Sequence, residues 1–309
     1  MTTTHCRAPR GSHPLVGQRG LRMDLERRRF IFWLTAPVIV ALLLLLLYPT
    51  LYIFYLAFAQ NKPGSAFPLT LNTMATVLQS RSFWHGTGVT LQFTLLSTAI
   101  SFALGFSMAY ALEIVDRLHS FFVTIFILPL AVMPVAAALT WRTMYDPTFG
   151  ILNYLLSFVG VDKISWTSNP TMALWSVMLV DVWQWTSFCF LILHAGFRTL
   201  PQDVQEAARI DGATAIQELI TISIPMLANI FLITLIFRFM EAFKAFDGIY
   251  VLTQGGPGDA TETLVVQAYR EAFQFFKPEI TAVIGIWLLL FTILCTRYAG
   301  NRIGKGDAT

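Results

Sequence analysis

Five side chains able to bind a polar ligand lie inside stretches that are otherwise apolar: Asp181, Gln184, Trp185, Arg238 and Glu241. An ionisable residue at the centre of a membrane-spanning helix costs about 2.5–3.5 kcal/mol on insertion scales, so it usually faces a cavity or a partner. Asp181, Gln184 and Trp185 are spaced to share one helical face. A carboxylate and an amide bind sugar hydroxyls, and an indole covers the apolar face of a sugar ring. All five residues are therefore predicted to lie along a ligand path.

A purely structural role is the alternative for the charged residues of this set. Arg238 and Glu241 are three residues apart and can pair on a helix, with Lys244 nearby. Such a pair would lock helices together or bind a second membrane subunit. The ligand path is therefore a hypothesis, which the substitution Asp181→Asn would test.

The composition indicates a membrane protein and predicts no cofactor. Hydrophobic residues make up 55% of the 309 residues and charged residues 13%, whereas soluble domains have about 25% charged residues. The net charge of +3 does not indicate a nucleic-acid partner. Cys6, Cys189 and Cys295 are far apart, and no histidine lies in an HxxxH or Cys/His pattern, so no metal site is predicted.

Six stretches are apolar enough to cross a bilayer, which takes about 20 residues per helix. Residues 30–60, 82–112, 118–141, 219–237 and 280–296 contain no charge, and residues 164–197 contain only Asp181. The predicted spans are residues 31–58, 87–112, 120–142, 171–196, 222–246 and 279–298. The predicted fold class is therefore an all-α integral membrane protein with six transmembrane helices.

These spans divide the chain into three predicted parts. Residues 1–29 form a cytoplasmic N-terminal tail, 30–298 a six-helix transmembrane domain, and 299–309 a cytoplasmic C-terminal tail. A signal peptide is a poor alternative because the first apolar run is too long and ends in aromatic residues. Met23 is an alternative start that would shorten the first tail.

The orientation follows from the lysines and arginines in the loops, which are enriched on the cytoplasmic side. With both termini inside (N-in/C-in), thirteen of these residues lie in cytoplasmic segments and six outside. Seven of the thirteen are in the N-terminal tail. The sequence therefore favours a multi-pass protein with both ends in the cytoplasm.

One cytoplasmic segment differs from its apolar neighbours. It contains EAARIDGATAIQELITISIP, residues 206–225, which is rich in alanine and polar residues. Pro201 and Asp203 suit the first turn of a helix, and Gly212 suits its left-handed cap. Thr214 and Gln217 form a capping-box pattern that begins a second helix. We call residues 197–223 the 197–223 loop; from these patterns alone it is either a connector or a docking element.

The same residues resemble the EAA loop of permease subunits of bacterial ABC importers. The matching pattern is Glu206-Ala207-Ala208, then Gly212, then Ile222 and Pro225. The resemblance extends over about residues 27–298, and the segments 128–156 and 246–264 are similar to the maltose- and glycerol-phosphate-type first permease. Two departures are Asn229, where the family often has a second proline, and FFKPEITAVI before the last span.

The resemblance implies a type I ABC importer permease fold in the bacterial cytoplasmic (inner) membrane. Its implied partners are a cytoplasmic ABC ATPase dimer, a second homologous permease subunit, an extracytoplasmic solute-binding protein, a carbohydrate and the lipid bilayer. The loop would be a coupling helix seated on the ATPase, with ATP bound by those partners and not by this chain. The implied docking residues are Glu206, Ala207, Ala208, Asp211 and Gly212.

The chain itself has no convincing nucleotide-binding or catalytic pattern. GNRIGKGDAT, residues 300–309, has the wrong spacing for a P-loop and no strand before it. GGPGDA, residues 255–260, is predicted to be a turn. An importer of a polyol or glycerol phosphate is the nearest alternative. A membrane-embedded enzyme and an ion-coupled secondary transporter are alternatives from other classes, but a self-powered carrier has no use for an EAA-type loop.

Overall fold

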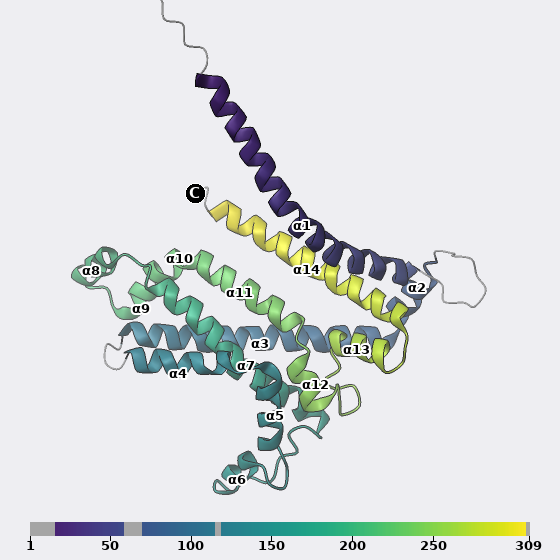
Figure 1. The fold of residues 1–309 in the computed structure, drawn as a ribbon. Helices are drawn as coiled ribbons and strands as arrows, with labels where there is room; N and C mark the ends of the chain where they lie inside the picture. Colours follow the sequence, from purple (N-terminus) through teal and green to yellow (C-terminus); the bar gives the residue numbers. More distant parts are fainter. Residues whose placement is uncertain (1–15, 59–69, 115–118, 307–309) are drawn as a thin grey trace, which may run out of the picture. The chain divides into compact units, whose positions relative to one another are not determined.

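The computed structural model describes residues 16–58, 70–114 and 119–306, and in these ranges every regular element is a helix (Figure 1). The chain divides into two compact units, Met1–Tyr55 and Leu56–Thr309. The predicted all-α class is therefore confirmed for the described part of the chain.

The first unit is formed by helix α1, Val16–Phe58, whose last three residues belong to the second unit. Its apolar part, Phe30–Phe58, has 29 residues and is long enough to cross a bilayer. Pro37 and Pro49 lie inside the helix without ending it. Because α1 begins at Val16, it extends into the predicted N-terminal tail of residues 1–29, which is therefore partly helical.

Three straight helices of the second unit are also long and apolar enough to span a membrane: α3 (Arg81–Ile114), α7 (Pro170–Phe197) and α14 (Pro278–Gly306, apolar over Pro278–Arg297). α3 and α7 pack along each other (Figure 1). Gly105 permits this close approach, because a Cβ atom there would lie 2.6 Å from Cβ of Cys189. With α1, four of the six predicted spans are thus single helices.

The third predicted span, residues 120–142, is wrong as a single helix. It consists of α4 (His119–Ala131) and α5 (Pro134–Met144), which meet at an angle of 94°. Met133 between them is extended, with φ −61° and ψ 136°. A residue before proline is disfavoured in the α region, so Pro134 explains both the end of one helix and the beginning of the next.

The fifth predicted span, residues 222–246, is also broken. A run formed by α9 (Ala215–Glu218), the π-turn η1 (Leu219–Ser223) and α10 (Ile224–Met226) meets α11 (Ala228–Phe243) at 71°. Pro225 has no N–H to donate, and the preceding π-turn alters the helical register. The described part of the chain therefore has four candidate spans formed by single helices, and six if each bent pair crosses as one.

Short helices and two apolar cores complete the second unit. The short helices outside the 197–223 loop are α2 (Asn72–Gln79), α6 (Ile151–Ser157), α12 (Asp247–Thr253) and α13 (Leu264–Phe273). One core includes Phe93 of α3, Met178 of α7 and Ile249 of α12. The other includes Phe190 of α7 and Leu227 before α11. The cores hold α3 and α7 against α11 and α12. Most of the predicted ligand-path residues lie where these four helices meet.

Candidate functional site

A charged network joins three helices in the interior of the second unit. The guanidinium of Arg238 on α11 contacts the carboxylate of Asp181 on α7, and its Nη2 also donates to Ser97 Oγ of α3 at 3.1 Å. The Arg238 side chain is completely buried, and that of Asp181 is 12% exposed. A buried charge needs a partner, so the two residues hold α7 and α11 together at this depth.

This pairing corrects the sequence-based expectation that Arg238 pairs with Glu241. Glu241 instead accepts from Lys244, whose Nζ lies 2.8 Å from Glu241 Oε1. Glu241 and Lys244 lie at the end of α11 and are partly exposed. Arg238 is buried and therefore takes the carboxylate that faces it across the helix interface.

Two further residues of the predicted path have internal partners. The guanidinium carbon of Arg238 lies 5.5 Å from the ring centroid of Trp185, within the range of a cation–π interaction. Gln184 Nε2 donates to the carbonyl oxygen of Val132, at the break between α4 and α5. The amide therefore satisfies a carbonyl group that the broken helix leaves free.

A cavity of about 220 Å³ lies beside this network, and we call it the polar cavity. Four of the five predicted path residues line it, while Arg238 lies behind Asp181. Its lining includes Asp181, Gln184, Trp185, Glu241, Lys244, Asp247 and Phe93. The sequence-based prediction did not include Phe93 or Asp247. Phe93 is one of many apolar residues of α3 and gives no sequence signal, and Asp247 lies in the loop-like FDG stretch after the fifth predicted span.

The first helix of the 197–223 loop is α8, Gln202–Ile210, with Pro201 at its N-cap and Asp203 in its first turn. It ends in a glycine cap, as predicted. Gly212 has φ +82°, and its N–H donates to Arg209 O at 3.1 Å. The N–H of Ala213 donates to Ala208 O at 3.0 Å, which completes a Schellman motif. A Cβ at Gly212 would meet no atom within 4 Å, so backbone conformation alone requires glycine.

The second part of the loop begins with the predicted capping box. Thr214 accepts from the N–H of Gln217, and the Gln217 side chain accepts from the N–H of Thr214 at 2.8 Å. Arg209 Nε lies 3.3 Å from Glu218 Oε2 and joins the two short helices. Tyr110 of α3 donates to Ala215 O at 3.3 Å, so the loop is attached to a membrane-spanning helix.

The surface of the 197–223 loop contains apolar side chains without a partner in the described part of the chain. Ile210 is 86% exposed, and Ile216 and Ile220 are also exposed. Of the predicted docking residues, Glu206, Ala207, Asp211 and Gly212 are exposed, whereas Ala208 is buried. Ala208 therefore packs inside the loop, and the others form its accessible face.

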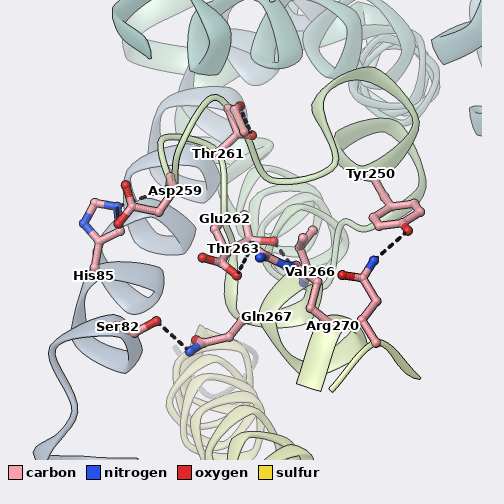
Figure 2. Close-up of polar contacts among 12 residues, drawn as sticks. Ser82, His85, Tyr250, Asp259, Thr261, Glu262, Thr263, Val266, Gln267 and Arg270 are labelled. Atoms are coloured by element: carbon pink, nitrogen blue, oxygen red, sulfur yellow. Dashed lines mark hydrogen bonds and ion pairs between the residues drawn. The ribbon is translucent and has the colours of Figure 1, made fainter. Parts of the chain in front are cut away.

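A second polar cluster lies around the turn that precedes α13 (Figure 2). His85 Nε2 lies 3.5 Å from Asp259 Oδ2, and Arg270 Nη1 lies 2.8 Å from Glu262 Oε1. Burial raises the pKa of the Glu262 carboxyl, and the positive charge of Arg270 opposes this. Gly255 and Gly258 have φ of +91° and +64°, so the predicted turn over 255–260 is confirmed.

Helices long and apolar enough to span a membrane line a polar cavity, and a capped helical loop joins two of them, as is expected of the membrane subunit of a transporter. Residues 101–301 match the family described as "binding-protein-dependent transport system inner membrane component". This match covers more than half of the chain, and the chain belongs to this family.

Relatives of known name are similar over most of the chain. It is 33% identical over 254 residues to the trehalose/maltose transport system permease protein of Thermococcus litoralis, covering 81% of this chain and 85% of that protein. It is 30% identical over 282 residues to the sn-glycerol-3-phosphate transport system permease protein of Agrobacterium fabrum, covering 89% and 94%.

A solved structure has the same fold. A chain of a bacterial ABC transporter involved in the import of the acidic polysaccharide alginate superposes with a TM-score of 0.82 and 21% identity, covering 92% of this chain and 98% of that one. The predicted type I importer permease fold is therefore confirmed.

Proposed function

We propose that this chain is one permease subunit of an ATP-driven importer that moves a carbohydrate across the cytoplasmic membrane. Membership of the binding-protein-dependent family, together with relatives named for trehalose/maltose and trehalose transport, carries this proposal. The chain acts with a solute-binding protein outside the membrane and with a pair of ATPase subunits in the cytoplasm.

The 197–223 loop transmits the motion of the ATPase to the membrane helices. Its exposed residues Ala207, Gly212 and Ile210 are small or apolar and suit a surface that another protein covers. The Schellman motif, the capping box and the Arg209–Glu218 pair make the loop rigid enough to move as one body. Because Tyr110 donates to Ala215 O, displacement of the loop also pulls on α3.

The polar cavity is this subunit's part of the carbohydrate path. Its volume of about 220 Å³ is below the roughly 300–1,000 Å³ of complete small-molecule sites. A second homologous permease supplies the remaining wall. Carboxylate oxygens of Asp181 and Glu241 accept from sugar hydroxyls, and Trp185 offers an aromatic surface.

Both termini lie in the cytoplasm in this proposal. That orientation places the 197–223 loop on the side of the ATP supply, and it agrees with the excess of lysine and arginine in the same segments. In this proposal ATP is bound by the partner ATPase subunits, and its free energy reaches this chain through the loop.

A polyol or glycerol phosphate importer is the second candidate, since the glycerol-3-phosphate permease relative covers as much of the chain as the sugar permeases do.

Uptake of labelled trehalose and maltose by cells that lack this chain tests the proposed function. We expect uptake of at least one sugar to be lost and then restored when the chain is supplied again. If uptake of both sugars and of glycerol 3-phosphate is the same with and without the chain, the proposed function is wrong.

A further inference from the structure

We infer that the polar cavity selects neutral carbohydrates and excludes anionic ones, an inference that rests on the proposed function and narrows its substrate class. The relatives leave this choice open, because their names include both neutral sugars and sn-glycerol 3-phosphate. The arrangement of charge around the cavity decides it.

Lys244, which lines the cavity, and Arg238, which lies next to it, are each paired with a carboxylate of the same chain. Arg238 contacts Asp181, and Lys244 Nζ lies 2.8 Å from Glu241 Oε1. Three carboxylates line the cavity, those of Asp181, Glu241 and Asp247, and no ion pair in the described part of the chain includes Asp247. The local charge is therefore negative, which repels an anion and leaves carboxylate oxygens free to accept from hydroxyl groups.

Arg238 is not accessible to an anion that enters the polar cavity. Its side chain is completely buried, and it does not line the cavity. The Nε and Nη1 atoms of Arg238 have no hydrogen-bond partner, but both are buried. A phosphate or carboxylate ligand could reach the guanidinium only by entering the interior and competing with Asp181, and a carboxylate left unpaired there is strongly unfavourable. A neutral polyhydroxy ligand requires no such exchange.

The first test asks which labelled compounds depend on the chain for uptake: trehalose, maltose and glycerol 3-phosphate. Chain-dependent uptake of a neutral sugar, without chain-dependent uptake of glycerol 3-phosphate, is expected. Chain-dependent uptake of glycerol 3-phosphate would overturn the inference while leaving the importer itself intact. Loss of all chain dependence would instead overturn the proposed function, so the two failures are distinct.

The second test changes the charge of the cavity. The complete transporter, purified in lipid nanodiscs without its binding protein, is heated with each compound, and ligand binding is measured as a rise in Tm. Native protein should respond to a neutral sugar and not to glycerol 3-phosphate. Glu241→Gln frees Lys244 and should create a response to glycerol 3-phosphate that disappears at high salt.

Two further variants make this result specific. Asp181→Asn frees Arg238 and should act in the same direction if the protein folds. Glu262→Gln is the matched control, because it removes a carboxylate from an ion pair of the same 2.8 Å distance that does not line the cavity. A glycerol 3-phosphate response in native protein, or its absence in Glu241→Gln, would overturn the inference.

Discussion

The contacts within the 197–223 loop join residues that are close in the sequence, whereas the polar cavity depends on contacts between distant ones. Thr214 and Gln217 are three residues apart, and Arg209 and Glu218 are nine apart. Arg238 reaches Asp181 over 57 residues and Ser97 over 141. The loop can therefore move without losing its own shape, while a relative movement of α3, α7 and α11 must change the cavity. This difference suits a loop that moves as one body and thereby changes the shape of the cavity.

Breaking the buried ion pair should have the largest effect. Asp181→Ala leaves Arg238 charged and unpaired in the interior, and loss of one partner of a buried pair costs about 3–5 kcal/mol. We expect a much lower Tm for the purified protein. The double variant Asp181→Leu with Arg238→Met should recover most of the stability but not transport. A single variant with native Tm would show that the pair does not hold the helices.

Crowding the interface between α3 and α7 tests whether the cavity depends on long-range packing. In Gly105→Ala the new Cβ would lie 2.6 Å from Cys189 Cβ and 2.7 Å from Phe190 N. Overpacking of this kind costs about 1–3 kcal/mol. The Tm should fall, and Gly88→Ala, where a Cβ meets nothing within 4 Å, is the control on the same helix. Equal effects of the two changes would contradict the close approach.

Removing the cap of the second loop helix should have a smaller, local effect. Thr214→Ala loses a capping interaction worth about 0.5–2 kcal/mol. Amide hydrogen exchange should become faster in the 214–223 segment, with little change in α7. Faster exchange throughout the membrane helices would mean that the loop is not an independent unit.

The surface ion pair of the loop should matter least. Arg209 is largely exposed, and exposed pairs are worth about 0.2–1 kcal/mol. Arg209→Gln should lower the stability of the loop slightly at low salt and not at high salt, because screening removes most of the interaction. A salt-independent loss would indicate packing by the arginine side chain instead.

The same contrast explains what the sequence could predict. The glycine cap at Gly212 and the Thr214 box depend on residues within one turn, and both predictions are confirmed. The apolar runs predicted the helices, but not the 94° and 71° bends beside Pro134 and Pro225. Whether a proline breaks a membrane helix depends on the neighbouring helices and side chains that satisfy the freed backbone groups.

The partner of Arg238 was predicted wrongly for a related reason. Spacing along one helix favoured Glu241, while the actual partner, Asp181, lies on another helix. Such a pairing follows from helix packing, and no spacing rule within a single segment indicates it.

Co-purification with the ATPase tests the central claim most directly, namely that the 197–223 loop is the docking element. The experiment compares the native chain, Gly212→Pro and Gly160→Pro, each captured from detergent with a candidate ABC ATPase. Both glycines have positive φ, +82° and +74°, and both N–H groups donate to a carbonyl three residues earlier, so the two prolines disturb the backbone equally. We expect the native chain and Gly160→Pro to retain the ATPase and Gly212→Pro to lose it. Retention by all three proteins would contradict the account and leave the loop as a connector.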